Sequence, residues 1–330
     1  MRPATQKSVY REIKSIQYQY LAEEFKKWME TIGYKPQTIK LANWHILEFF
    51  SFLERQNISY LKEYKQDHLI CYMDYLHHRT NCIRNGSLSA GYINKHISSL
   101  RLFSKYLHIS KKAGLIIKPE LLKTTETVSY LTKEEIKKIY KSAGEEKNKY
   151  KQRDIAMLSL FYGCGLRAGE GAALNIGDIL FEKGLIYIRK GKNYRERYVP
   201  ISREVKNDLK NYINGQRKEL LNACPSSCGK NNTKATDESS QALLLSRRGN
   251  RWSVQGMYQR LQYLKNQTND ENLKQKTFGL HILRHSIATH LLQSGMKLEY
   301  ISRFLGHKSL ETTQKYTHLI KEENFHLRGS

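Results

Sequence analysis

The spacing of apolar residues over the first third of the chain is the strongest constraint on its fold. Between about Gln19 and Leu107, large apolar side chains recur every three or four residues, which places them on one face of an α-helix. Gly33 and Pro36 interrupt the first of these patterns, because neither residue continues a helix readily. The pattern predicts helices over residues 21–32, 39–53, 69–76 and 93–107, packed into one core.

The last predicted helix also carries basic residues. Its apolar positions run from Ile93 to Leu107 on one face, which leaves Lys95, Arg101 and Lys105 on other faces. A solvated face and a face turned toward phosphate groups produce the same pattern. These three lysine and arginine residues are therefore candidate contacts for a polyanion, and the sequence leaves both interpretations open.

A break in the periodicity divides the chain. Between Ser110 and Ser129 the residues are mostly Lys, Gly, Pro and Thr, which indicates a linker. Thr132 and Glu135 then form the pattern of a capping box that opens a new helix. We expect an N-terminal extension, a helical domain, a linker, a second domain and a tail, at residues 1–18, 19–109, 110–129, 130–320 and 321–330.

The second domain combines helices with a small hairpin. Apolar helices are expected through Tyr140 and over residues 155–162, and another over residues 204–221. Two short alternating segments, 185–188 and 198–201, flank the polar turn 191–194 and predict a β-hairpin. Residues 223–241 are small and polar, which is typical of a surface loop. The predicted fold class is mainly α with a small β-hairpin or sheet, in two domains.

The net charge indicates a polyanionic partner. Lys and Arg number 56 against 31 acidic residues, which gives a formal charge of +25. Such an excess attracts nucleic acid through its long-range field, although charge alone does not separate DNA from RNA. A membrane surface is the alternative, but the basic residues are spread over the whole chain and not gathered on one amphipathic helix.

No apolar stretch approaches the roughly 20 residues that span a bilayer. The segment Met1–Tyr20 is polar and shows no secretion signal, and the five cysteines are scattered. We therefore expect a cytoplasmic protein without a membrane partner. Cys224 and Cys228 cannot by themselves complete a tetrahedral zinc site, so no metal and no cofactor is predicted.

A series of cationic residues precedes one tyrosine near the C-terminus. The series reads His281-Ile-Leu-Arg284-His285, then Leu305-Gly306-His307, then Tyr316. A tyrosine hydroxyl has a pKa near 10 and is a poor nucleophile at neutral pH. It becomes effective when cationic groups hold a phosphodiester beside it and neutralise the charge that develops during attack.

The order Arg…Lys…His-x-x-Arg…His…Tyr resembles the tyrosine recombinase family, also called the phage integrase family. The resemblance covers residues 130–320, including Arg167-Ala-Gly-Glu170 upstream, and residues 92–107 more weakly resemble that family's helical core-binding domain. Gly169 stands where the family usually has Ser, and no expected catalytic atom is involved. The resemblance implies a two-domain DNA clamp that cuts and rejoins DNA.

The resemblance also implies a role for each residue. Arg167 and Arg284 would bind the non-bridging phosphate oxygens, and His281 would donate to the same phosphate or act as a general base. His307 would add one hydrogen bond, and Tyr316 would be the nucleophile.

Two further groups complete the expected site. Lys192, in the hairpin turn, would protonate the leaving 5′ oxygen, although Lys190 is two residues away and the turn register is open. Glu170 would hold Arg167 or a histidine, and His285 would support the site by packing.

The implied reaction forms a 3′-phosphotyrosyl bond without ATP or metal. Its substrate is a double-stranded DNA recombination site, and a homo-oligomer, expected to be a tetramer, binds it. Accessory DNA-bending or directionality proteins are further partners of the family. A type IB topoisomerase and a DNA-binding regulator with vestigial residues remain alternatives. The polar loop near residue 230 and the Lys-rich composition favour a mobile-element integrase or transposase over an Xer-type resolvase. The tail either docks on a neighbouring subunit or frays.

Overall fold

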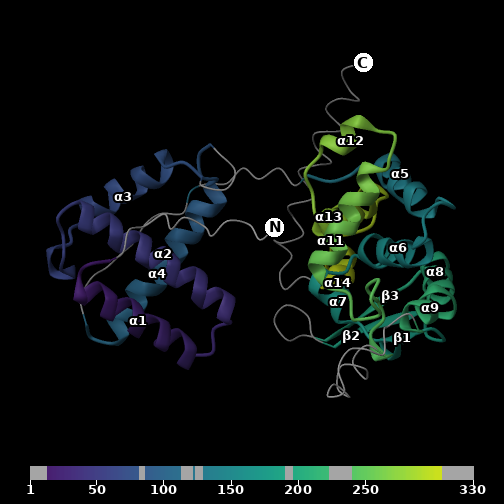
Figure 1. Cartoon of the computed structure of the whole chain (residues 1–330), viewed down its shortest axis with the longest axis horizontal. Helices are drawn as coiled ribbons and strands as arrows, with labels where there is room; N and C mark the ends of the chain where they lie inside the picture. The colour runs from purple at the N-terminus through teal and green to yellow at the C-terminus, as the bar shows by residue number, and fades with distance from the viewer. Residues whose placement is uncertain are drawn as a thin grey trace. The chain divides into compact units, whose positions relative to one another are not determined.

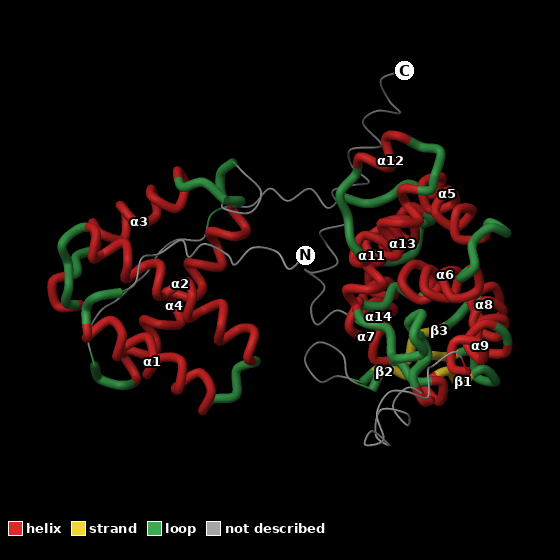
Figure 2. Tube along the Cα trace, in the orientation of Figure 1, coloured by secondary structure: helices red, strands yellow, loops and turns green. Residues whose placement is uncertain are grey.

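The chain forms two compact units, Met1–Glu126 and Thr127–Ser330 (Figure 1). The computed structural model describes residues 13–81, 86–112, 122, 129–189, 196–222 and 240–306. Both units are built mainly from helices, and the second also contains a small sheet (Figure 2). The predicted fold class is therefore confirmed.

The first unit consists of long helices with aromatic residues between them. Its helices are α1 (Ile16–Thr31), α2 (Pro36–Arg55), α3 (Gln66–His78) and α4 (Ala90–Ile109), with a 3₁₀ turn, η1, at Leu61–Glu63. The Ser15 hydroxyl accepts from the Tyr18 amide and the Ser89 hydroxyl accepts from the Tyr92 amide, so both serines cap their helices. The four predicted helices are all present.

Aromatic rings fill the core of this unit. The Tyr18 and Phe50 rings stack with centroids 4.3 Å apart, and both side chains are fully buried. The prediction that Ile32 shares this buried face is wrong, because α1 ends at Thr31 and Ile32 is 50% exposed. Pro36 begins α2 at the first helical position, where its missing N–H costs nothing.

A buried polar cluster lies among these apolar residues. Glu48 of α2 is fully buried and pairs with Arg79 at 2.6 Å. The His45 and His96 rings are also fully buried, with centroids 3.8 Å apart. Burial is the main reason that the pKa of His45 falls to about 4 and that of His96 to about 2. Both imidazoles are therefore neutral at pH 7.

The second unit combines helices with a small sheet (Figure 1). The elements before the sheet are α5 (Lys133–Gly144), α6 (Lys151–Leu158), η2 (Ser159–Gly163), α7 (Ala168–Ala173) and η3 (Ile176–Asp178). The elements after the sheet are α8 (Arg203–Asn214), α9 (Gln216–Asn222), α11 (Val254–Asn266), α12 (Glu271–Gln275), α13 (Leu280–Gln293) and α14 (Leu298–Leu305). The predicted capping box is present, since Thr132 and Glu135 exchange side-chain-to-backbone hydrogen bonds.

The sheet has three antiparallel strands in the order β1-β2-β3. The strands are β1 (Ile179–Leu180), β2 (Leu185–Ile188) and β3 (Arg197–Pro200). Ile186 of β2 lies opposite Val199 of β3, and both point into the core. The predicted hairpin is therefore present. Strand β1 was not predicted, because two residues are too few to show an alternating pattern in the sequence.

Two helix predictions need correction. The helix predicted over residues 204–221 is divided at Gly215, whose φ of −102° and ψ of −108° are not helical. A Cβ at this position would lie 2.5 Å from Oε1 of Gln152, so this side chain lies close to the chain at the break. Helix α11 was not predicted, and most of the polar segment 223–241 lies outside the described residues.

Candidate functional site

An irregular turn after α6 prepares the site. The helix widens into the π-helical turn η2, where the Cys164 amide donates to the Ser159 carbonyl. Such turns occur mostly at functional positions. Gly165 then adopts a left-handed φ of +58°, which an L side chain rarely takes. The chain therefore reverses within a few residues and begins α7 with Arg167 as its N-cap residue.

Arg284 connects this turn to the end of α14. It lies on α13, which packs against both η2 and α14. Its Nη1 donates to the Gly165 carbonyl at 2.5 Å, and its Nη2 donates to the Leu305 carbonyl at 2.6 Å. The residue is only 3% exposed. A guanidinium can be buried in this way because carbonyl oxygens satisfy its donors.

Arg167, the N-cap residue of α7, also contacts the end of α14. Its Nη2 donates to the Gly306 carbonyl at 3.0 Å, one residue beyond the carbonyl that Arg284 contacts. Its Nη1 donates to Glu170 at 2.9 Å. The structure therefore brings Arg167 and Arg284, far apart in the sequence, to adjacent peptide groups at the C-terminal end of α14.

Glu170 is enclosed by donors. Its carboxylate accepts from the Arg167 side chain and, at 2.9 Å, from the Arg167 amide. Arg197 of β3 donates to both oxygens, with distances of 2.7 and 2.8 Å. Burial would raise the pKa of Glu170, but hydrogen bonds and charge from Arg197, together with the bonds from Arg167, lower it to about 2. Glu170 is therefore ionised, and its carboxylate binds both the amide and the side chain of Arg167.

Arg197 was missed as a site residue from the sequence. A signal was present, because residues two apart in a strand share a face and Val199 is fully buried. A charged residue on the core face of a strand requires a partner. Its partner, Glu170, is 27 residues away in the sequence, and only the folded chain identifies it.

The remaining predicted site residues fall into two groups. His281 is exposed in the first turn of α13, and His285 is half-buried one turn later on the same helix. Lys190, Lys192, His307 and Tyr316 lie outside the described residues.

The helix before His307 ends at a glycine. Gly306 ends α14 in the left-handed conformation, with φ of 65° and ψ of 51°. His307 follows Gly306 directly in the chain.

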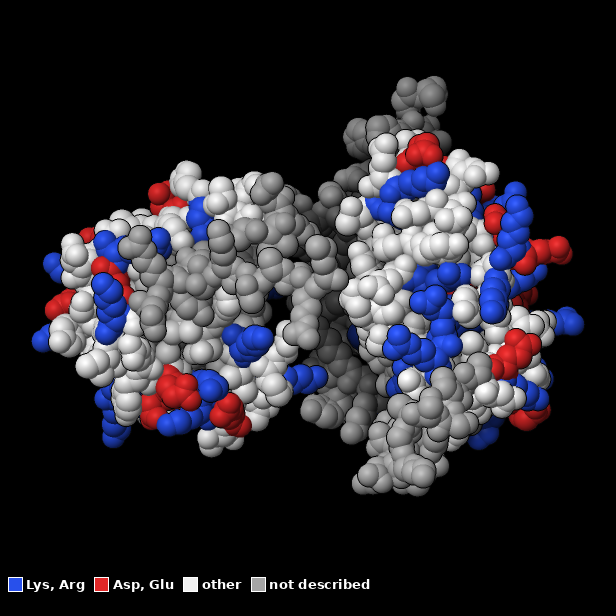
Figure 3. Space-filling view, viewed as in Figure 1, with Lys and Arg blue, Asp and Glu red and all other residues white. Residues whose placement is uncertain are grey.

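A basic hollow of about 710 Å³ lies elsewhere on the second unit, next to the start of α11. Arg153 stacks between the rings of Tyr150 and Trp252, at 4.3 and 4.1 Å from their centroids. Arg247 and Arg248 are exposed on its rim, and among the described residues no ion pair engages either side chain. Figure 3 shows Lys and Arg side chains gathered over the middle of the visible face of this unit.

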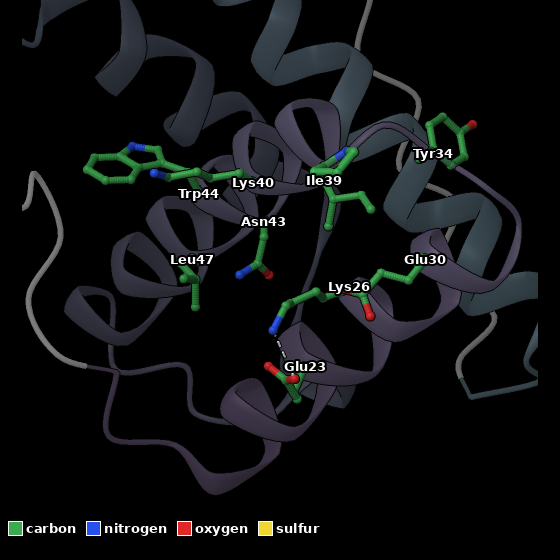
Figure 4. A pocket seen from close by; sticks show the side chains of 10 residues that line it. Glu23, Lys26, Glu30, Tyr34, Ile39, Lys40, Asn43, Trp44 and Leu47 are labelled. Atoms are coloured by element: carbon green, nitrogen blue, oxygen red, sulfur yellow. Dashed lines mark hydrogen bonds and ion pairs between the residues drawn. The ribbon is translucent and has the colours of Figure 1, made fainter. Parts of the chain in front are cut away.

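The first unit carries the other predicted basic residues. Lys95, Arg101 and Lys105 are all exposed on α4. A separate cavity of about 570 Å³ lies between α1 and α2, where Lys26 pairs with Glu23 at 3.2 Å and Trp44 lines the rim (Figure 4). Acidic and basic side chains are mixed in this cavity, unlike the hollow beside α11.

Two kinds of site are absent from the described part of the chain. Within it, no helix is both long and apolar enough to cross a bilayer. Nor do three His, Cys, Asp or Glu side chains gather there as a metal-binding group.

Comparison with known proteins assigns the family. The model of the phage integrase family matches residues 129–323. Tyrosine recombinase XerD of Oceanobacillus iheyensis is 30% identical over 304 residues, covering 85% of this chain and 95% of that protein. The chain therefore belongs to the phage integrase family, and it is a site-specific tyrosine recombinase.

Two solved structures share its fold. XerH site-specific recombinase in a post-cleavage complex with palindromic difH substrate has a TM-score of 0.68 and 22% identity, covering 94% of this chain and 84% of that one. The Tn1549 transposon integrase in complex with circular intermediate DNA has a TM-score of 0.67 and 18% identity, covering 90% and 94%.

Proposed function

We propose that this protein cuts and rejoins double-stranded DNA at specific sites through a 3′-phosphotyrosine formed by Tyr316. The observation that carries the proposal is the convergence of Arg167 and Arg284 on the carbonyls of Leu305 and Gly306. His307 follows at once in the chain, and Tyr316 comes nine residues later. We infer that this pair of guanidinium groups binds the phosphodiester that Tyr316 attacks.

The arginines supply the electrostatic part of catalysis. As the Tyr316 oxygen attacks phosphorus, negative charge grows on the non-bridging oxygens, and fixed cations stabilise that charge best when they need not reorganise. Arg167 is held by Glu170, and Arg284 by two carbonyls. His281 donates to the phosphate or takes the tyrosine proton, while Lys192, or Lys190, protonates the leaving 5′ oxygen.

The cycle conserves the energy of the broken bond. The P–O5′ bond breaks as the P–O(Tyr) bond forms, and the released 5′ hydroxyl of a second duplex then attacks the phosphotyrosine. The cycle requires no ATP, since one phosphodiester replaces another. Arginines here provide the charge neutralisation that other phosphoryl-transfer enzymes obtain from metal ions.

DNA contacts are proposed on both units. Lys95, Arg101 and Lys105 of the first unit are exposed, as are Arg247 and Arg248 of the second. Phosphate contacts from such residues give affinity that is sensitive to salt and independent of sequence. We propose that the units clamp the duplex and that four copies assemble for strand exchange, with accessory DNA-bending or directionality proteins as further partners. The DNA complexes of XerH and the Tn1549 integrase support the choice of DNA.

The biological role has two candidates. The polar segment near residue 230 and the Lys-rich composition favour the integrase or transposase of a mobile element. The XerD relative, at 30% identity over most of its length, favours the Xer-type resolvase. Two substrates separate these roles. An Xer-type resolvase should resolve a plasmid that carries two directly repeated sites, whereas an integrase should insert a circular donor into a linear target.

A suicide DNA substrate tests the chemistry. A nick near the cleavage position lets the short fragment that carries the new 5′ hydroxyl diffuse away, so the covalent complex accumulates. We expect an adduct on Tyr316 that survives denaturant, and a Tyr316→Phe variant that binds the same DNA without forming it. An adduct in that variant would refute the assignment. Relaxation of plasmids lacking any specific site would instead favour a topoisomerase.

A further inference from the structure

We propose that Arg197 is a positioning residue for DNA cleavage, because it fixes Glu170 and Gly306 and thereby aims Arg167 at the phosphate. The inference rests on the proposed function and adds a residue to it. Arg197 is placed in strand β3, which follows the segment that holds Lys190 and Lys192.

The first support is the geometry of the carboxylate. Arg197 binds Glu170 through two parallel bonds of 2.7 and 2.8 Å, which fixes the plane of the carboxylate as well as its distance. The side chains of Glu170 and Arg197 are 3% and 13% exposed, so water competes little. Arg167 donates to the same carboxylate from its own helix turn. The direction of the Arg167 guanidinium therefore depends on an anion that Arg197 holds still.

The second support is the close approach at Gly306. A Cβ at this residue would lie 2.5 Å from Cδ and 2.6 Å from Nε of Arg197, so only glycine allows the contact. The carbonyl of the same residue accepts from Arg167. Arg197 and Arg167 thus contact one peptide unit, which precedes His307 in the chain. Strand β3, the start of α7 and the end of α14 are joined at this point.

Removing Arg197 has an electrostatic consequence that simple loss of packing does not have. Burial alone would raise the pKa of Glu170, and the bonds and charge of Arg197 are the largest opposing influence. Without Arg197, Glu170 takes up a proton as the pH falls through a range where the native residue stays ionised. A neutral carboxyl holds Arg167 weakly, so cleavage by the variant becomes sensitive to acid.

The experiment measures single-turnover formation of the covalent adduct by the full chain on a suicide substrate, between about pH 5.5 and pH 8.5. Each variant rate is divided by the wild-type rate at the same pH, which removes the titration of groups common to both. For Arg197→Met we expect the ratio to fall toward the acid end, by up to about ten-fold for each pH unit below the pKa that Glu170 has in the variant. Glu170→Gln should give a low ratio that does not change with pH.

Arg260→Met is the matched control. Arg260 also binds a buried carboxylate, donating to Asp154 from Nε and Nη2 at 2.8 and 2.6 Å, but it does not contact Glu170. Its loss should lower stability without adding a pH dependence to the cleavage ratio. Arg197→Lys retains a single point charge and should restore part of the rate at low pH.

The outcomes separate the two proposals. If wild type forms no adduct, the proposed function itself fails. If wild type cleaves and the Arg197→Met ratio is as flat as that of Arg260→Met, Arg197 is structural only and the inference is overturned. If Arg197→Met does not fold, Arg197→Lys decides: a wild-type rate at every pH overturns the requirement for two parallel bonds, and an acid-dependent loss supports it.

Discussion

Gly306→Ala tests whether the end of α14 depends on a close approach that only glycine permits. The residue has a φ of +65°, and its new methyl group would lie 2.5 Å from Cδ of Arg197. Gly295→Ala is the control, because Gly295 has a φ of +85° but no atom within 4 Å of its added Cβ. Both substitutions strain the backbone, and only the first displaces Arg197.

The expected magnitudes follow from this difference. A left-handed alanine costs roughly 1–2 kcal/mol, which applies to both variants. Moving Arg197 away from Glu170 weakens hydrogen bonds to a buried charge, and these are worth about 1.5–3 kcal/mol. In a unit of this size, each kcal/mol of lost stability lowers the melting temperature by about 2–4 °C. Gly295→Ala should therefore melt about 2–8 °C below wild type, and the decrease for Gly306→Ala should be about twice as large.

Two measurements decide the result. Thermal unfolding by circular dichroism reports stability, and adduct formation on the suicide substrate reports cleavage. We expect Gly295→Ala to cleave at close to the wild-type rate and Gly306→Ala to lose most of its cleavage below its melting temperature. Equal stability and equal cleavage in the two variants would refute the reasoning, since the close approach would then have no effect.

Three further predictions concern other parts of the chain. Arg284→Ala should lose far more cleavage than DNA binding, measured by adduct formation and by mobility shift, because one contact among many sets affinity while transition-state charge depends on it; equal losses would contradict a catalytic role. Arg247→Gln and Arg248→Gln should each reduce the slope of log affinity against log salt by about 1 if each side chain contacts a phosphate, and an unchanged slope would exclude that contact. His45→Gln should make the stability of the first unit less sensitive to acid. The pKa of His45 is about 4 in the folded chain and near 6.5 when unfolded, so the unfolded state binds the proton first and stability falls as the pH drops below about 6.5. By pH 4 this loss of stability is on the order of 3 kcal/mol. It is measured by hydrogen exchange of the α2 amides in wild type and variant. The difference between the two proteins separates the effect of His45 from the titration of Glu48 and His96.

The sequence by itself determined the local features of this protein. Apolar periodicity located the helices of the first unit, because a helix repeats every 3.6 residues and packs with one face. Thr132 and Glu135 marked a helix start, because capping uses residues within one turn. The ordered series from Arg167 to Tyr316 indicated the family, because the family carries those residue types in that order.

Only the tertiary structure decided which of these residues meet. The bond from Arg167 to Gly306 spans 139 positions of the sequence, and that from Arg284 to Gly165 spans 119. No local pattern records such a pairing. The same holds for Arg197, whose partner Glu170 lies on another element. Contacts between distant segments form only when the chain closes around its core, so they depend on the whole fold and not on any one window of sequence.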